Sequence, residues 1–107
     1  MVKVRRFDIW LVGLNPTKGR EINNTRPCVV ISPNEMSALS TVLMAPMTTK
    51  GFEFPCRIAC KFKGKKGLIL LDQIRAIDKS RLVKKLGNVS SKTQLKLCSG
   101  LQEMFEY

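Results

Sequence analysis

Cationic and polar side chains that could act on an anionic substrate gather in three segments of this sequence. The first is NPTKGREINNTR, which holds Lys18, Arg20, Glu21 and Arg26 around Gly19. Long polar connections on β scaffolds often carry functional sites, because rigid strands hold their two ends. The same composition also fits a solvated basic loop, so the residues alone leave both interpretations open.

Arg26 stands immediately before Pro27 and the apolar run Cys28–Ile31. Proline is tolerated at the first residue of a strand, and an unbroken apolar run indicates a strand buried on both faces. The strand would hold the guanidinium of Arg26 at its N-terminal end. A planar guanidinium is suited to two oxygens of a phosphate, and a salt bridge that ties the loop to the barrel is the alternative.

The second segment places Thr48 and Thr49 directly after an apolar run and before Lys50 and Gly51. Two roles are open for the threonine hydroxyls. They donate to a phosphate, or they cap the turn.

The third segment, LLDQIRAID, interrupts apolar residues with Asp72, Gln73 and Arg75. Strand alternation would place Asp72 and Ile74 on one face and Gln73 and Arg75 on the other. We expect Asp72 to be a structural carboxylate, which if buried needs a partner such as an arginine.

The sequence has no histidine, so no side chain titrates near neutrality without a perturbed pKa. Four cysteines are present without a CxxC pair, which argues against the common zinc spacings. We therefore predict no metal and no cofactor, and we expect buried, reduced thiols at Cys28, Cys56, Cys60 and Cys98.

The 107 residues carry a formal net charge of +11, with 19 lysines and arginines against 8 acids. Such a charge predicts a polyanionic partner, since ordinary solubility needs a net charge of only about 2 to 8. No apolar window approaches the roughly 20 residues of a membrane span, and Asp8 interrupts the apolar run near the N-terminus. We expect one cytoplasmic domain over residues 1–107.

Short apolar segments between turn residues predict strands over residues 8–14, 27–32, 41–47, 54–60 and 67–71. The stretch DKSRLVKKLG fits one or two helical turns ended by Gly87. A capping box of Ser91 and Gln94 predicts a final helix, with an apolar stripe at Leu97, Leu101, Met104 and Phe105. These elements predict a mainly β fold, a small β-barrel with a C-terminal helix on it.

The segments DIWLVGLNPTKGREINNTRPCVVISP, VLMAPMTT and GLILLDQIRAIDKSRL resemble the MazF/PemK family of bacterial toxins. The resemblance covers residues 6 to 105. It implies an SH3-like barrel, of a type that the CcdB gyrase poisons share, and a homodimer. It also implies metal-independent cleavage of single-stranded RNA at a short sequence, and neutralisation by a cognate antitoxin.

The resemblance implies that Arg26 and Thr48 carry catalysis. It also implies that Glu21 corresponds to the acidic residue that the family has in this loop. The positions that it implies for RNA binding are Lys18, Arg20, Thr49, Asp72, Gln73 and Arg75. Two departures from the family limit what is carried over: this chain has no histidine in the first loop, and Leu70 stands where relatives place an arginine before the aspartate.

RNA carries its own nucleophile, so an enzyme needs only to align the 2′-hydroxyl with the phosphate and stabilise the developing charge. Arg26 and Thr48 are suited to the phosphate oxygens, and Glu21 is the candidate acceptor of the 2′ proton. The expected ends are a 2′,3′-cyclic phosphate and a 5′-hydroxyl. The alternatives are a non-catalytic RNA-binding module and a gyrase poison, although the C-terminal LQEMFEY lacks the tryptophan of the poisons.

We expect the antitoxin to use an acidic, partly disordered segment that folds on binding.

We expect Trp10 in the core or in a dimer interface, because the alternating strand around it explains an aromatic without base stacking.

Overall fold

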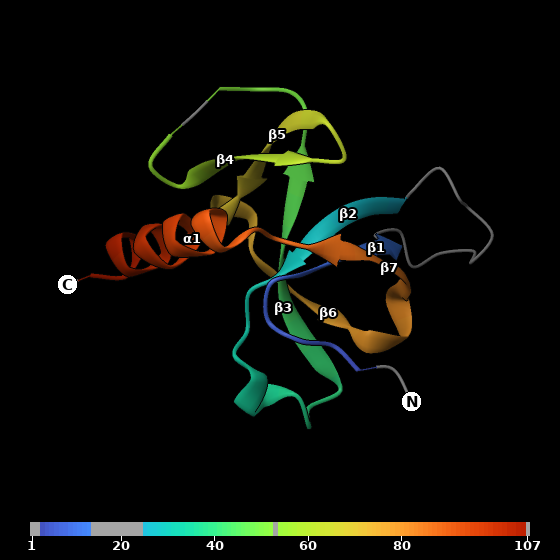
Figure 1. Ribbon diagram of the computed structural model, residues 1–107. Coiled ribbons are helices and arrows are strands. Elements are labelled where there is room, and N and C mark those ends of the chain that lie inside the picture. The colour runs from blue at the N-terminus through green and yellow to red at the C-terminus, as the bar shows by residue number, and fades with distance from the viewer. Residues whose placement is uncertain (1–2, 14–24, 53, 107) are drawn as a thin grey trace.

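The computed structural model describes residues 3–13, 25–52 and 54–106 (Figure 1). The strands and the helix within these residues are β1 (Asp8–Gly13), β2 (Thr25–Val30), β3 (Thr41–Thr48), β4 (Arg57–Phe62), β5 (Lys65–Leu70), β6 (Arg75–Asp78), β7 (Leu82–Asn88) and α1 (Ser91–Met104). Short 3-10 turns, η2 (Asn34–Met36), η3 (Leu71–Gln73) and η4 (Lys79–Arg81), join some of them. No helix among these residues is long and apolar enough to cross a membrane.

The strands form one antiparallel sheet in the order β4-β5-β3-β2-β1-β7, and β6 also pairs with β3. The long strand β3 organises this sheet. One edge of β3 meets β2, while the other meets β6 along Thr41–Met44 and β5 along Met47–Thr48. The sheet therefore curls around β3 into a half-barrel, with the β4–β5 hairpin at one end and β6 at the other (Figure 1). The predicted mainly β fold with a C-terminal helix is confirmed.

The two faces of the sheet pack against separate cores, because alternate side chains of each strand point to opposite faces. The first core joins Ile9, Val29, Ala45 and Met47 to Leu97 of the helix. The second core contains Trp10, Val12, Cys28, Val30, Val42, Met44 and Ile77. Trp10 is buried there, which confirms the core interpretation of that residue.

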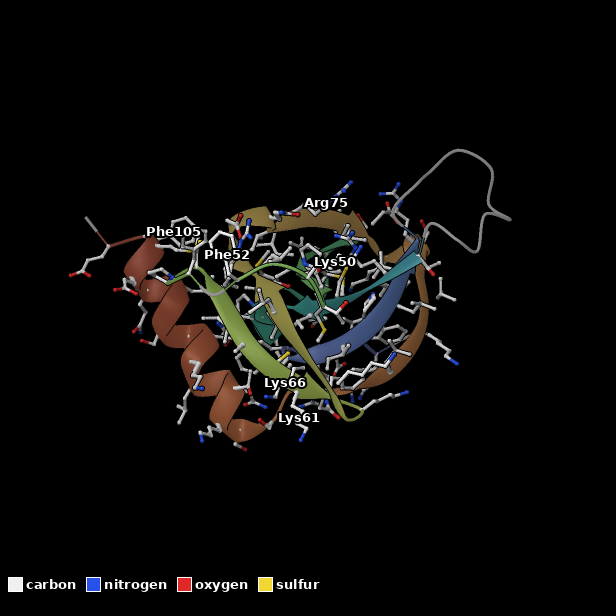
Figure 2. The ribbon with its side chains drawn as sticks, turned by 90° about the horizontal axis from the view of Figure 1, so that it is seen from above. Lys50, Phe52, Lys61, Lys66, Arg75 and Phe105 are labelled. Atoms are coloured by element: carbon white, nitrogen blue, oxygen red, sulfur yellow. The ribbon has the colours of Figure 1, made fainter. Side chains whose placement is uncertain are left out.

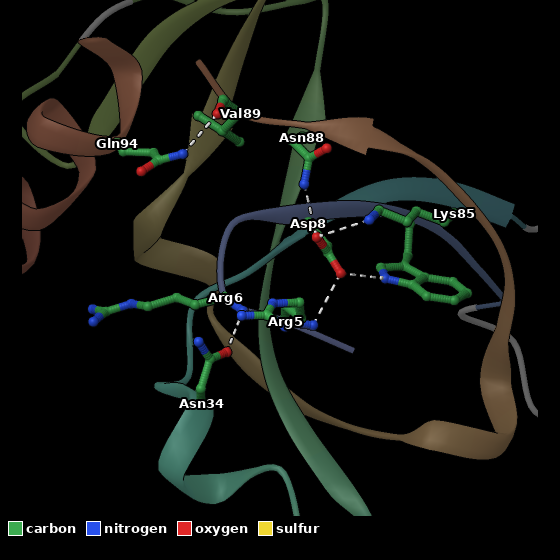
Figure 3. Close-up of polar contacts among 9 residues, drawn as sticks. Arg5, Arg6, Asp8, Asn34, Lys85, Asn88, Val89 and Gln94 are labelled. Atoms are coloured by element: carbon green, nitrogen blue, oxygen red, sulfur yellow. Dashed lines mark hydrogen bonds and ion pairs between the residues drawn. The ribbon is translucent and has the colours of Figure 1, made fainter. Parts of the chain in front are cut away.

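Asp8 is a buried carboxylate that joins β1 to β7 (Figure 3). It accepts hydrogen bonds from the Arg5 backbone N–H at 2.9 Å and from Asn88 Nδ2 at 2.9 Å, and it pairs with Lys85 Nζ at 3.3 Å. Trp10 Nε1 donates to the same carboxylate at 3.5 Å. The aspartate and tryptophan of the DIW segment are thus structural, since the charge is matched by donors and a cation.

The predicted helical turns over DKSRLVKKLG are wrong beyond η4, because Leu82–Asn88 forms strand β7 on β1. Alternation did not reveal this strand, since three consecutive residues, Val83, Lys84 and Lys85, are exposed and the register shifts twice. Pairing with the free edge of β1 outweighs local propensity here. Strand β6 was also missed, and β4 begins at residue 57, not at residue 54.

The C-terminal helix is confirmed, with its cap one residue earlier than predicted. Ser90 is the N-cap, and its Oγ accepts from the Thr93 N–H at 3.3 Å, while Gln94 Nε2 donates to the Val89 carbonyl at 2.9 Å. Leu97 is fully buried, but the end of the predicted stripe, Met104 and Phe105, is exposed. The helix therefore docks on the barrel through its middle only.

Candidate active site

Arg26 and Thr48 come together at the end of the β2–β3 pair. Cys28 of β2 lies opposite Pro46 of β3, and the two strands are antiparallel. Arg26, two residues before Cys28, therefore lies level with Thr48, two residues after Pro46. Alternation places both side chains on the face that carries Cys28 and Met44. Arg26 is exposed and makes no ion pair with a described residue, so its guanidinium is available to an anion.

The Thr48 hydroxyl is held in place by the turn that follows it. Its Oγ1 accepts from the Lys50 N–H at 3.2 Å, which confirms the turn-capping interpretation. The hydroxyl proton is not used in this bond, because a hydroxyl has one donor and two acceptor sites. Thr48 can therefore cap the turn and donate to a phosphate at the same time.

Arg75 approaches this site from β6. It lies opposite Met44, and alternation from the buried Ile77 places its side chain on the same face as Arg26. Burial raises the pKa of the Cys28 thiol to about 11, and the charges of Arg26 and Arg75 oppose that rise. Both guanidinium groups thus lie near a neutral thiol, which makes this end of the sheet positive.

Asp72 has an arginine partner, which we expected only for a buried carboxylate, although both residues lie at the surface. Arg57 donates from Nε to Oδ1 at 3.3 Å and from Nη2 to Oδ2 at 3.2 Å, and these bonds lower the pKa of the Asp72 carboxyl. The predicted alternation around Asp72 and Gln73 is wrong, since both belong to the 3-10 turn η3 and both are exposed.

The guanidinium that contacts Asp72 comes from the strand beside Leu70. Arg57 lies directly opposite Leu70 in the β4–β5 ladder, so the neighbouring strand supplies the guanidinium to this carboxylate. The sequence does not reveal this partner, because Arg57 and Asp72 are 15 residues apart and the ladder register sets their distance.

A pocket of about 400 Å³ opens beside Arg26 and Thr48, between the ends of β2 and β3 and the β4–β5 hairpin. Thr49 lines it just after the end of β3, and the hairpin contributes five residues that were not predicted as site residues: Cys60, Phe62, Lys65, Lys66 and Gly67. The stretch KFKGKK, residues 61–66, lies between two predicted strands, and we predicted no site residue in it. Its density of lysines on both sides of a glycine was the available indication of a functional hairpin.

Three predicted residues, Lys18, Arg20 and Glu21, lie outside the described residues and stay predictions. Gly13 and Thr25, which flank the segment that contains them, are paired with each other. Thr25 is the neighbour of Arg26, so Gly13 and Thr25 both lie at the end of the sheet where Arg26 lies. The four cysteines are free: Cys28 is buried, while Cys56, Cys60 and Cys98 are half-buried.

Curated relatives match nearly the whole chain. It is 30% identical over 105 residues to "Endoribonuclease MazF" of Staphylococcus epidermidis, which covers 92% of this chain and 88% of the relative. It is 32% identical over 99 residues to "Endoribonuclease MazF9" of Mycobacterium tuberculosis, which covers 82% of this chain and 84% of the relative.

Solved structures share the fold. A mycobacterial endoribonuclease in complex with its cognate antitoxin superposes with a TM-score of 0.79 at 20% identity, over 94% of this chain and 93% of that one. MazF from Deinococcus radiodurans has a TM-score of 0.76 at 20% identity, over 97% of both chains. The model of the PemK-like, MazF-like toxins matches residues 5–105. This chain therefore belongs to the PemK-like, MazF-like family of toxins of type II toxin-antitoxin systems.

Proposed function

We propose that this toxin is an endoribonuclease that cuts single-stranded RNA at the site formed by Arg26 and Thr48, without a metal ion. The observation that carries the proposal is the placement of a free guanidinium and a fixed hydroxyl on one face, at the shared end of β2 and β3. The relatives named endoribonuclease support it, since two of them are at least 30% identical over most of the chain.

The proposed reaction is attack of the RNA 2′-oxygen on the adjacent phosphorus. The O2′–P bond forms and the P–O5′ bond breaks, which gives a 2′,3′-cyclic phosphate and a 5′-hydroxyl. Arg26 stabilises the phosphoryl oxygens with two parallel N–H donors, and Thr48 donates a further hydrogen bond. The 2′ proton passes to a carboxylate, for which Glu21 is our candidate, and the leaving O5′ takes a proton.

The RNA path includes Thr49, Gln73 and Arg75, together with Lys18 and Arg20 of the first loop. Asp72 is exposed and held ionised by Arg57, so it can accept hydrogen bonds from RNA hydroxyls or base edges. Arg57 makes Asp72 a poor base, because hydrogen bonds to the ionised form lower its proton affinity. The pair supports a role for Asp72 in RNA binding and not as the base, for which Glu21 is our candidate.

The proposed partners are a second copy of the chain and an acidic antitoxin segment. Solved MazE–MazF structures from Deinococcus radiodurans support an antitoxin partner. The net charge of +11 is complementary to an acidic, partly disordered segment that folds on the toxin. Exposed apolar side chains on and just after the C-terminal helix, Leu95 at 75% and Phe105 at 74%, support a homodimer that covers apolar surface. Cellular RNA as substrate places the proposed activity in the cytoplasm.

The test is cleavage of a long unstructured RNA by the purified protein in excess EDTA, with the new ends mapped. We expect discrete cuts with 5′-hydroxyl ends in the wild type and a loss of at least about 100-fold in rate for Arg26→Ala. Arg26→Lys is expected to restore little, because lysine keeps the charge but lacks the planar pair of donors.

The matched control is Arg5→Lys, since Arg5 is exposed at the N-terminal end of the fold, and its rate is expected to equal that of the wild type. Binding of intact RNA without cutting would overturn the proposal and favour a non-catalytic RNA-binding module. Full activity of Arg26→Lys would overturn the role of the planar guanidinium.

A further inference from the structure

A second groove, of about 600 Å³, lies on the β4–β5 hairpin next to the candidate active site. Four lysines from three elements line it: Lys61 of β4, Lys66 of β5, and Lys92 and Lys96 of α1. No described acidic residue lines this groove, and the two ion pairs among the described residues use none of these lysines. We call it the lysine groove.

The register of the sheet connects the lysine groove to Thr48. Thr48 lies opposite Leu68 of β5, and Leu68 lies opposite Ala59 of β4. Lys61 and Lys66 are an opposed pair two residues further along the hairpin, so alternation places them on the same face as Thr48. Both project from the hairpin in Figure 2. The lysine groove and the pocket beside Arg26 also share Thr49, Lys66 and Gly67 among their lining residues.

The arrangement of the four lysines is unfavourable in the absence of an anion. Lys61 and Lys66 are like charges directly opposite each other in an antiparallel ladder, which destabilises the pair. Lys92 and Lys96 are like charges at an i, i+4 spacing near the helix N-terminus, where the helix dipole also disfavours cations. A bound polyanion would relieve both repulsions at once.

Phe52 adds an aromatic surface to the same groove. Its side chain is 64% exposed, although a phenylalanine is normally buried. Exposed aromatic rings beside a cationic track are typical of proteins that bind single-stranded nucleic acid, because each base can stack on them. An acidic peptide would satisfy the lysines, but it would not account for the ring or for the continuity with the Arg26 site.

We propose that the lysine groove binds the phosphates of the RNA segment that flanks the cleaved bond, with Phe52 stacking on one of its bases. The proposal rests on the proposed function, since it extends the RNA path beyond the phosphate held by Arg26 and Thr48. Lysines suit this role because they act as point charges on the backbone and carry no sequence information.

The test measures binding of a 20-nucleotide unstructured RNA with 2′-O-methyl groups, which cannot be cut by 2′-hydroxyl attack. Two double variants, Lys61→Gln/Lys66→Gln and Lys92→Gln/Lys96→Gln, are compared with the wild type between 50 and 200 mM salt. Each neutralised phosphate contact contributes about 0.7 to the slope of log affinity against log salt for a single strand. We therefore expect each pair to reduce the slope by about 1.4 and the affinity by about tenfold or more at low salt.

The matched control is Lys3→Gln/Lys84→Gln, which removes the same charge from exposed positions that do not line the groove. It is expected to leave the salt slope nearly unchanged. Phe52→Ala is expected to weaken binding without changing the slope, because stacking releases no counterions. The melting temperatures of the lysine variants are expected to stay equal to or rise above that of the wild type, as repulsion is removed.

Groove variants that bind RNA like the control would overturn the proposal, while cleavage by the wild type would still support the proposed function. Binding losses in the groove variants support the lysine groove even if the wild type fails to cut natural RNA, which would overturn only the proposed function. Unchanged RNA binding combined with lost binding of a 20-residue polyglutamate would assign the groove to an acidic protein segment and overturn the proposal.

Discussion

At the scale of single residues, the site depends on where charges are left unpaired. Arg26 has no carboxylate partner among the described residues, whereas Arg57 is occupied by Asp72 through two hydrogen bonds. The unpaired arginine is free to bind a phosphate, and the paired one shapes the turn that precedes β6. The same residue type thus serves chemistry in one place and structure in the other, according to its neighbours.

The Arg57–Asp72 pair gives a pH-dependent contribution to stability. Arg57 lowers the pKa of Asp72 in the folded state, so the stabilisation is present above the unfolded-state pKa of about 3.9 and is lost as the pH falls through the folded-state pKa. We expect Asp72→Asn to melt slightly below the wild type at pH 7, with a difference that shrinks as the pH falls below about 4.

Thermal melts of both proteins from pH 7 to pH 2 check this expectation. Glu103→Gln is the control, because Glu103 is exposed and forms no ion pair with a described residue. Arg57→Leu should show the same loss as Asp72→Asn at pH 7, and the double variant should lose little more, since the two residues act as one pair. A difference that is constant or grows towards low pH would contradict this account.

At the scale of secondary structure elements, the close approach of β3 and β5 sets the position of Thr48. Gly67 lies where a Cβ atom would stand 2.9 Å from the Thr48 carbonyl oxygen. That neighbour is backbone, so it cannot turn aside as a side chain could. A glycine at this position therefore allows the hairpin to pack against the strand that ends in Thr48.

Gly67→Ala is expected to reduce the rate of RNA cleavage by at least tenfold and the free energy of unfolding by about 1–3 kcal/mol. The methyl group would displace the Thr48 backbone, and small shifts of a catalytic group are costly. Gly13→Ala is the control, since its Cβ would meet nothing nearer than the Arg81 carbonyl at 3.9 Å. The readouts are single-turnover cleavage and urea denaturation.

A double variant separates displacement of Thr48 from general damage. Thr48→Ala/Gly67→Ala is expected to cut about as slowly as Thr48→Ala alone, because the second change acts through a hydroxyl that is already gone. Independent losses that multiply would show that Gly67 acts on another part of the site.

Sequence patterns predicted those elements whose local features agree with the fold. The apolar run after Pro27 became β2, and the helix formed one residue away from its predicted cap. Strand β7 was not recognised, because Val83, Lys84 and Lys85 are all exposed on an edge and only β1 specifies their conformation. Edge strands with one partner carry little alternation, so a single sequence does not reveal them.

The candidate site likewise has features that the sequence indicates and features that only the folded sheet reveals. The positions of Arg26 and Thr48 at strand ends could be predicted, because neighbouring residues mark those ends, while their catalytic roles rest on the family resemblance and stay predictions. Arg57 and the lysine groove could not, since they depend on which strands lie side by side. The register that joins β4 to β5, and β5 to β3, is a property of the folded sheet.

At the scale of the whole molecule, the charge is distributed so that the site end of the sheet is strongly positive. The chain carries a net charge of +11, and the lysine groove continues the positive surface of Arg26 and Arg75. An excess of this kind steers a polyanion to the site from a distance and raises the association rate. We expect the proposed acidic antitoxin segment to compete with RNA for the same surface.

The charge predicts that RNA binding falls steeply with salt. If about five phosphates make contacts, four with the groove lysines and one with Arg26, the slope of log affinity against log salt is about −3.5, so affinity drops about 130-fold between 50 and 200 mM. Fluorescence anisotropy with the uncuttable 20-nucleotide RNA measures this slope, and an uncharged peptide nucleic acid of the same sequence is the control. That control releases no counterions, and its binding should hardly respond to salt. An affinity for RNA that stays flat over this range would mean that the basic surface does not carry the binding, and recognition would then depend on base contacts alone.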